Sequence, residues 1–473
     1  MLAPPAWLPF AILPRGPHLM KLRMVSLLVL CCLAGSWRVQ AADWPQFRGP
    51  HRDDVSAETG LLKQWPAKGP SLLWTYRDAG VGYSGPAIVG DRLFTMGARG
   101  DTEFVFALSI SQQGKQLWAT PIGPKFDWKK GNEWNQGPAA TPTVDGDRVY
   151  ALGGQGILVC VDVGTGKLHW RKDLPAEMHA VVNNIAGSPQ GIGWGFTWSP
   201  LVDGGHLIIQ PGGPDGTLGA LDKRTGSVIW RSKGFTDGAS YASPIAADVG
   251  GQRQYIQLTN SGLTGVWAKD GKTAWHYAEE YHGVVIPTPL VHDNKVYASA
   301  SGGGCVLVSL TSAGGKVKAK KIYANNNLTN QSGGVLLVDR HVFGSAGIKG
   351  WLCQDFATGK ITGRERRRLG AGSLTCADGR LYCYGEEEGT IVLVDANPTK
   401  WTMRDWKEYG RFTIPEHSKL RKVSGKIWTH PVVANGKLYL RDQDLIFCYD
   451  VKAQATSGAN PLREGTRGGA GSR

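Results

Sequence analysis

The chain has 473 residues, including 65 glycines and 18 tryptophans, and its formal net charge is +14. Frequent glycine without any long amphipathic helical pattern excludes a helical bundle and favours an all-β chain with many turns. No apolar run approaches the roughly 18 residues that a membrane-spanning helix needs, so we expect no transmembrane segment.

The first segment, residues 1–41, predicts a signal peptide. A basic stretch at Met20–Arg23 precedes the apolar run Met24–Leu33, and small residues lead to a cleavage position near Ala41. We therefore expect Met20 to be the start and the mature protein to be exported, to the periplasm or outside the cell. Cys31 and Cys32 lie in this segment and leave a lipid anchor open. An exported protein is not expected to bind nucleic acid.

The segment from Gly137 to Trp170 is the clearest copy of a unit that the chain repeats. Four short apolar runs are separated by turns at Asp145-Gly146, Gly153-Gly154 and Gly164-Thr165-Gly166. Asp-Gly and Thr-Gly supply the positive φ that tight hairpins need, and period-2 runs rich in Val, Tyr and Leu suit half-buried strands. The unit predicts a four-stranded antiparallel meander.

Eight such units follow one another, and their starts are 40 to 58 residues apart. This spacing is close to that of four-stranded propeller blades. We therefore predict an all-β fold, an eight-bladed β-propeller of four-stranded antiparallel blades, over residues 72–450. The units begin at Pro86, Pro142, Pro200, Pro244, Pro289, Gly334, Leu374 and Pro431.

The two ends of the propeller segment complement each other. The last unit supplies only three strands, and the strand that ends near Trp74 lacks the three that should precede it. We expect this N-terminal strand to complete the last blade and close the ring. Residues 42–71, which include the motif WPQFRGP, predict a strap that lies across the domain and is anchored by aromatic side chains. Residues 451–473 lack apolar periodicity and predict a disordered tail.

Tryptophan recurs in the last strand of the units. A large flat side chain on an outer strand can bury itself against the neighbouring blade, so we expect these residues to pack between blades and not to bind a ligand. They are Trp74, Trp118, Trp170, Trp230 and Trp275.

Six cysteines remain after the signal peptide. Three share one position of the repeat and are expected to be small buried apolar residues: Cys160, Cys353 and Cys448. Cys376 and Cys383 flank a hairpin turn. A two-residue hairpin pairs Cys376 with Leu381, which disfavours a disulfide, although export leaves one open.

Basic residues gather in two of the predicted outer strands, at Lys316–Lys321 and Arg364–Arg368. Charged edges that prevent sheet-to-sheet association explain them. The alternative is a docking patch for an acidic partner or an anionic lipid surface.

The repeats resemble a known family. Ala220–Trp230 reads Ala-Leu-Asp-x-x-Thr-Gly-x-x-x-Trp, and Val161–Trp170 and Asp355–Lys360 are variants of it. These segments are similar to the tryptophan-docking repeats of the pyrroloquinoline quinone (PQQ)-like propeller family. WPQFRGP resembles the N-terminal motif of exported planctomycete members. The resemblance implies either a quinoprotein dehydrogenase or a non-catalytic scaffold such as the BamB-like component of outer-membrane barrel assembly.

The dehydrogenase branch carries residues that this chain lacks. The resemblance implies a quinone held between a tryptophan and an adjacent-cysteine disulfide, calcium on carboxylate and amide oxygens, and an aspartate base. The mature chain has no adjacent cysteine pair and no haem-attaching Cys-x-x-Cys-His. These differences favour the scaffold branch.

The connections between blades differ in length. Those after Trp118, Trp170 and Trp406 run 24, 30 and 25 residues to the proline that begins the next unit, and they belong to neighbouring blades. We call their side of the ring the long-loop face; the tight turns lie on the opposite side, the turn face. Aromatics interleaved with amides suit a binding surface, and loops that cap the channel are the alternative. The candidate binding residues are Phe126, Trp128, Glu133, Trp134, Asn135, His179, Asn183, Asn184, Trp194, Trp198, Trp428 and His430.

No motif in the chain assigns a catalytic residue or a metal site. We predict an exported, monomeric, non-catalytic propeller that binds a protein, peptide or glycan on the long-loop face, without a cofactor. The alternative is a PQQ-dependent oxidoreductase with calcium and a divergent site.

Overall fold

The computed structural model describes residues 43–128, 134, 136–184, 187, 191–366 and 368–454. Ala41–Arg473 form one compact unit. The predicted signal peptide and residues 455–473 of the predicted tail lie outside the described residues. Among the helices of the described part, none is long and apolar enough to cross a membrane.

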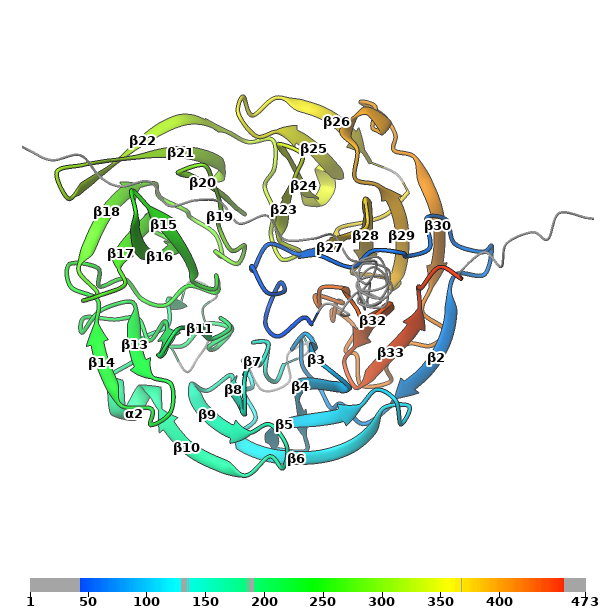
Figure 1. Cartoon of the computed structure of the whole chain (residues 1–473), viewed down its shortest axis with the longest axis horizontal. Coiled ribbons are helices and arrows are strands. Elements are labelled where there is room, and N and C mark those ends of the chain that lie inside the picture. Colours follow the sequence, from blue (N-terminus) through cyan, green and yellow to red (C-terminus); the bar gives the residue numbers. More distant parts are fainter. Residues whose placement is uncertain are drawn as a thin grey trace, which may run out of the picture. The chain divides into compact units, whose positions relative to one another are not determined.

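Eight antiparallel sheets follow one another around a ring, in chain order (Figure 1). The prediction of an eight-bladed β-propeller is confirmed. Helix is confined to α2 (Leu174–Met178) and two 3-10 turns, η2 (Gly347–Lys349) and η3 (Pro398–Lys400), in the described part.

We number the blades by their innermost strands. Blade 1 contains β3 (Ala87–Val89), β4 (Arg92–Arg99), β5 (Thr102–Ser109) and β6 (Lys115–Pro124); blade 2 contains β7 (Thr143–Asp145), β8 (Arg148–Leu152), β9 (Ile157–Asp162) and β10 (Leu168–Asp173). Blade 3 contains β11 (Leu201–Asp203), β12 (His206–Ile209), β13 (Gly219–Asp222) and β14 (Val228–Arg231); blade 4 contains β15 (Ile245–Val249), β16 (Gln252–Thr259), β17 (Gly262–Trp267) and β18 (Thr273–Ala278). Blade 5 contains β19 (Leu290–His292), β20 (Lys295–Ala300), β21 (Gly304–Ala313) and β22 (Lys316–Asn325); blade 6 contains β23 (Val335–Val338), β24 (His341–Ser345), β25 (Trp351–Asp355) and β26 (Ile361–Glu365). Blade 7 contains β27 (Gly372–Ala377), β28 (Arg380–Gly385), β29 (Thr390–Asp395) and β30 (Glu408–Thr413); blade 8 contains β31 (Val432–Ala434), β32 (Lys437–Asp442), β33 (Leu445–Asp450) and, from the N-terminus, β2 (Ser71–Tyr76).

Strand β2 closes the ring as the sequence predicts. It pairs antiparallel with β33, and Trp74 lies opposite Cys448. Blade 7 departs from four strands, because β1 (Val55–Ser56) of the strap adds to β27 in parallel. Closure leaves no unpaired sheet edge between the two ends of the chain.

The recurring tryptophans pack on a glycine turn of the next blade. A Cβ on Gly166 would lie 2.6 Å from the Trp118 ring, and the indole N–H of Trp118 donates to the Val163 carbonyl at 3.2 Å. Glycine is required there because its φ is +73° and the indole fills the space that a side chain would take. The same packing recurs for Trp74 on Gly114, Trp170 on Gly226 and Trp230 on Gly271.

Four blades vary this arrangement: blades 6 and 7 have Gly363 and Gly410 at the docking position, with Trp401 and Trp65 packed against them, and blades 4 and 5 differ as follows. The Trp275 indole N–H donates within its own blade, to Gln254 at 2.8 Å. In blade 5 Tyr323 takes the docking position: its ring lies against Gly359 and its hydroxyl donates to the Phe356 carbonyl at 3.0 Å. The predicted inter-blade role of tryptophan therefore extends to tyrosine.

Two of the three cysteines that share one repeat position lie opposite docking side chains, and the third, Cys353, lies opposite Gly363. Cys160 pairs with Trp170 across β9 and β10, and Cys448 pairs with Trp74. Both thiols are buried and all six described cysteines are free, including Cys376 and Cys383.

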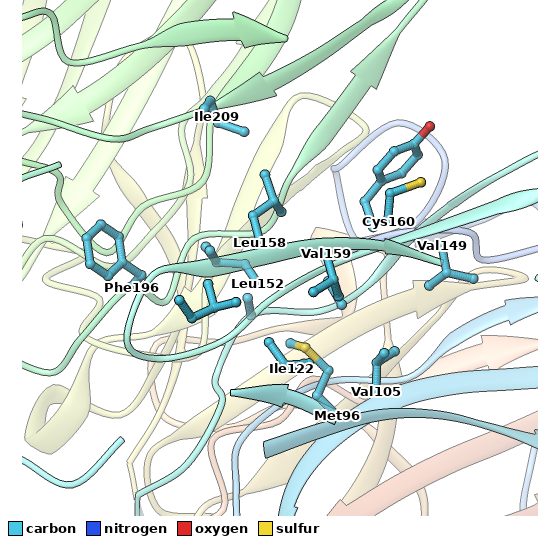
Figure 2. Packing of buried hydrophobic residues seen from close by; sticks show 14 of the residues in the cluster. Met96, Val105, Ile122, Val149, Leu152, Leu158, Val159, Cys160, Phe196 and Ile209 are labelled. Carbon is cyan, nitrogen blue, oxygen red and sulfur yellow. The ribbon is translucent and has the colours of Figure 1, made fainter. Parts of the chain in front are cut away.

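Aliphatic side chains fill the space between blades. Figure 2 shows Met96 and Ile122 of blade 1 next to Leu152 of blade 2, and all three belong to one buried cluster. The cluster continues to Phe196, whose side chain is fully buried. Adjacent sheets are thus held face to face mainly by apolar contact.

The strap runs through the middle of the ring, where Figure 1 draws it in dark blue. Trp44 pairs with Ile88 in the inner strand of blade 1, and the Pro45 carbonyl accepts from the Val144 N–H of blade 2 at 2.8 Å. The strap therefore enters the channel, in addition to the predicted anchoring by aromatic side chains.

Arg52 of the strap holds blades 3 and 4. Its guanidinium donates to the carbonyls of Ser199 at 3.1 Å and Pro244 at 3.0 Å, and also to the Pro200 carbonyl. The side chain is buried, and burial lowers its pKa to about 9, with a smaller contribution from Arg48. It is therefore still charged at neutral pH.

Arg48 holds blades 5 and 6 in the same way. Its guanidinium donates to the Thr288 carbonyl at 3.4 Å and to the Val335 carbonyl. Its Nε lies 2.7 Å from the Asp54 carboxylate, and both side chains are fully buried. Asp54 neutralises the charge that Arg48 brings into the channel.

The end of the strap reaches blades 7 and 8. Besides the β1–β27 pairing, the Ser56 hydroxyl donates to the Val433 carbonyl at 2.8 Å. The Glu58 carboxylate accepts from the N–H groups of Asn435 and Gly436 at 2.8 and 3.0 Å. The strap thus bonds to all eight inner strands or to the residues directly before them.

The described chain continues past the predicted end of the propeller. Val451 is fully buried and Lys452 forms a bridge with Leu61 of the strap.

We predict that Gly166→Ala destabilises the protein more than Gly146→Ala does. Both glycines have positive φ, but a Cβ on Gly146 meets nothing within 4 Å. We expect a free-energy loss of about 1 kcal/mol for Gly146→Ala from the backbone alone, and about 1–3 kcal/mol more for Gly166→Ala, because Trp118 must move. Denaturant unfolding of the two variants measures the difference, and equal losses would contradict the docking role.

We predict that Arg52→Met lowers the free energy of unfolding by about 3 kcal/mol or more, because buried carbonyls lose their donor. Arg77→Met is the matched control: Arg77 is exposed and pairs with Glu416 at 2.7 Å on the surface, so its loss should stay below about 1 kcal/mol. Similar melting of the two variants would show that the strap does not hold the ring.

Candidate functional site

A pocket of about 1270 Å³, counting the open space at its mouth, lies at the centre of the long-loop face. It is lined by the three long links between blades: the first link (125–142), the second (179–200) and the third (414–431). Six of the predicted binding residues line it: Phe126, Trp128, Trp134, Trp194, Trp428 and His430.

The strap contributes to the lining. Phe47 and Arg48 face the pocket together with His430. His430 Nδ1 lies 3.2 Å from both carboxylate oxygens of Asp54, and the Phe47 ring meets the His430 ring edge-on at 5.4 Å. Sequence reasoning missed Phe47 and Arg48, although both stand in the WPQFRGP motif.

An aromatic wall surrounds Trp428. Its ring centroid lies 4.9 Å from Tyr83, 5.7 Å from Trp134 and 6.3 Å from Trp194, which in turn lies 5.5 Å from Tyr241. Trp134 is 38% exposed and stacks on Trp428 at 22°. These rings come from five separate parts of the chain, and Tyr83 and Tyr241 were not predicted.

Glu386 holds Trp428 in place. Its carboxylate accepts from the Trp428 indole N–H at 3.1 Å, and its carbonyl accepts from the Ile427 N–H at 2.8 Å. Burial raises the pKa of Glu386 above its ordinary value.

Glu103 holds the start of the first link. Its two carboxylate oxygens accept from the N–H groups of Phe126 at 3.0 Å and Gly154 at 2.8 Å. Burial raises the pKa of Glu103 from its ordinary value of 4.5 to about 7. This residue gives no signal in the sequence, because it stands inside an otherwise ordinary strand.

Two hydrogen-bond donors in the first link have no partner in the described structure. The Gln136 side-chain oxygen accepts from the Trp128 backbone N–H, while Gln136 Nε2 and Trp128 Nε1 are buried and unpaired. Both side chains line the pocket. A ligand with oxygen acceptors would satisfy them.

The predicted asparagines of the second link have positioning roles. Asn184 Oδ1 accepts from the Gly193 N–H at 2.8 Å, and Asn183 Nδ2 donates to Asn260 at 2.8 Å. Trp194, which follows Gly193, donates its backbone N–H to the Tyr241 hydroxyl at 3.1 Å. These bonds fix the turn that presents the Trp194 ring.

The remaining predicted residues lie away from the pocket or outside the described residues. Trp198 is fully buried in the core between blades. His179 is exposed at the end of α2 and pairs with Asp215 at 2.9 Å. Glu133 and Asn135 lie outside the described residues.

The first basic cluster lies on an outer strand, and the second begins on one and continues past its end. Lys316, Lys318, Lys320 and Lys321 are exposed along β22. Arg364 lies in β26, and Arg368 pairs with Asp405 at 2.7 Å, while Arg367 lies outside the described residues. Both clusters are distant in topology from the pocket, which is lined by links and inner strands.

The pocket offers little charge. Among the described lining residues the basic side chains are Arg48 and His430, and both face Asp54. No group of three or more metal-binding side chains occurs in the described part of the chain.

Comparison with known proteins shows which family this chain matches. Residues 103–362, more than half of the chain, match the family described as outer membrane protein assembly factor BamB. The chain belongs to this family. The BamB of Yersinia pestis is 23% identical over 304 residues, covering 61% of this chain and 70% of that protein.

This BamB-family chain is also similar to enzymes. The lupanine 17-hydroxylase [cytochrome c] of a Pseudomonas species is 27% identical over 209 residues, which cover 41% of this chain and only 26% of that protein. The quinohemoprotein alcohol dehydrogenase of Comamonas testosteroni has the same fold, with a TM-score of 0.57 at 13% identity, over 88% of this chain and 82% of that one. The fold is therefore shared by both branches and does not choose between them.

We predict that Glu103 makes stability fall as pH rises from about 4.5 to about 7. The unfolded carboxyl ionises near 4.5 and the folded one near 7, so the folded state binds the proton more tightly in between. The contribution of Glu103 to the free energy of unfolding is fully present below pH 4.5. It falls by about 3 kcal/mol as the pH rises to 7. Glu103→Gln should flatten the pH profile of the unfolding free energy over this range, whatever its absolute stability. Parallel profiles would contradict the assignment.

Proposed function

We propose that this protein is an exported, non-catalytic binding propeller, whose long-loop face engages its partner through the aromatic pocket. The single observation that carries the proposal is the convergence of three long links and the strap on one apolar pocket. Concave, mostly apolar pockets with a few polar groups are the usual form of a binding site.

Binding is favoured over simple capping by what the links leave unfilled. Links that only cap a channel would pack their aromatic side chains closely and satisfy their donors. Here Trp134 keeps 38% of its surface exposed, and Trp128 and Gln136, which line the pocket, each keep a buried donor without a partner.

The charge of the pocket supports a ligand other than PQQ. PQQ carries three carboxylates and its calcium needs several oxygen ligands. Among the described lining residues, Arg48 and His430 are both committed to Asp54. The described residues that line the pocket therefore do not fit the quinone and its metal.

The relatives support a role in binding at the cell envelope. The name of the Yersinia pestis protein makes it an assembly factor for outer membrane proteins. Together with the predicted signal peptide over residues 1–41, this favours export and a partner that is itself in the envelope.

We expect a photo-crosslinking amino acid at Trp134 or Leu420 to capture a partner in cells of the source organism. Leu420 is 49% exposed in the third link. The same amino acid at Lys167, in a tight turn on the opposite face, is the control and should capture nothing specific. Equal capture from both faces would contradict the proposal.

The purified protein without the crosslinking amino acid should neither bind PQQ with calcium nor oxidise alcohols in a dye-linked assay. Stoichiometric quinone binding with turnover would replace the binding proposal by the oxidoreductase alternative.

A further inference from the structure

The pocket presents neutral chemistry to its ligand, and this inference rests on the proposed binding function. Asp54 neutralises Arg48 and faces His430. The Glu386 carboxylate accepts a hydrogen bond from the Trp428 indole N–H. A strongly charged ligand would find no opposite charge among the described lining residues and would lose its hydration on entry.

The rim of the pocket offers few backbone N–H donors to a peptide that would pair with it as with a sheet edge. Peptides that add to a sheet need N–H donors on its edge strand. Six of the eight inner strands are preceded directly by a proline, which has no N–H, at their long-loop end. The strap already occupies the edge of β27 in blade 7. The prolines are Pro86, Pro142, Pro200, Pro244, Pro289 and Pro431.

The side chains provide flat apolar faces with donors beside them. Trp134, Trp194 and Trp428 form a continuous set of indole rings on one side. Trp128 and Gln136 line the same pocket, and their Nε1 and Nε2 atoms are unpaired donors that are covered in this structure. A sugar ring has an apolar C–H face that covers an indole and a rim of oxygens that accept hydrogen bonds, so it matches both features.

Acceptors for sugar hydroxyls are also present. Gln331, Ser332 and Thr197 line the pocket, and their side chains carry oxygen atoms that accept hydrogen bonds. A volume of about 1270 Å³, counting the mouth, is larger than a single ring needs.

We propose that the pocket binds a neutral oligosaccharide. One ring stacks on the indoles of the aromatic wall, and its oxygens accept from Trp128 Nε1 and Gln136 Nε2, which the ligand uncovers as it enters. Four observations support this ligand class: the stacked indole rings, the unpaired donors, the lack of unpaired charge among the described lining residues, and the prolines that precede six inner strands.

The test titrates the full mature chain with maltohexaose, cellohexaose, laminarihexaose and chitohexaose, by calorimetry and tryptophan fluorescence. At least one should bind, and hexagalacturonate, which is anionic, should bind more weakly. Trp128→Phe keeps an aromatic ring but removes the indole N–H together with the five-membered ring that carries it. It should weaken binding about five- to tenfold, the value of one hydrogen bond.

Trp65→Phe is the matched control. Trp65 is also buried with an unpaired Nε1, but it packs on Tyr382 and Phe412, away from the pocket. The affinity of the Trp65→Phe variant for the sugar should equal that of the unmodified protein. Binding that Trp128→Phe and Trp65→Phe affect equally would overturn the proposal.

Absence of binding by all four neutral sugars would also overturn it. If crosslinking at Trp134 still captures a polypeptide, only the ligand class fails and the binding function stands. If neither sugar nor partner engages the long-loop face, both fail together.

Discussion

The ring depends on two buried arginines that reach from a non-repeating strap into a channel lined by backbone carbonyls. Inner strands of a propeller point unpaired backbone groups at the axis, and leaving these groups without partners is costly. Arg48 and Arg52 supply donors to blades 3 to 6, and the rest of the strap bonds to the other four. A guanidinium suits this role because its several N–H groups diverge within one plane. Asp54 makes the arrangement tolerable by placing one carboxylate against Arg48 in the same buried space.

The same strap determines the shape of the candidate site. Because Phe47 and Arg48 reach into the channel, they form part of the pocket's lining. Asp54 also faces His430 of the third link, so the ion pair that holds the ring is continuous with the pocket. The fold and the site are therefore coupled: a substitution at Asp54 removes the counter-ion of Arg48 and the partner that orients His430.

The sequence was sufficient for the repeating part of the fold and insufficient for the strap. Turn chemistry and the Thr-Gly spacing set the number of blades, since each blade is a local meander whose strands pair with their neighbours in sequence. The contacts of Arg48 join residues 240 and 287 positions apart, and no repeat or motif encodes such a pairing. The site was predicted in part for the same reason. Link length identified Trp128, Trp194 and Trp428, whereas Tyr83 and Tyr241 lie in shorter segments that gave no such signal.

Tryptophan has three separate roles in this chain, and position in the blade separates them. Trp118 lies in an outer strand, opposite a small residue, and packs on the glycine of the next turn. Trp194 and Trp198 are four residues apart in one link, yet one lines the pocket and the other is fully buried between blades. The difference arises because Trp194 follows the turn fixed by Asn184, while Trp198 precedes the inner strand, where neighbouring blades converge and exclude solvent. Distance from the next inner strand therefore distinguishes a pocket tryptophan from a core tryptophan in this link, where composition alone treats them alike.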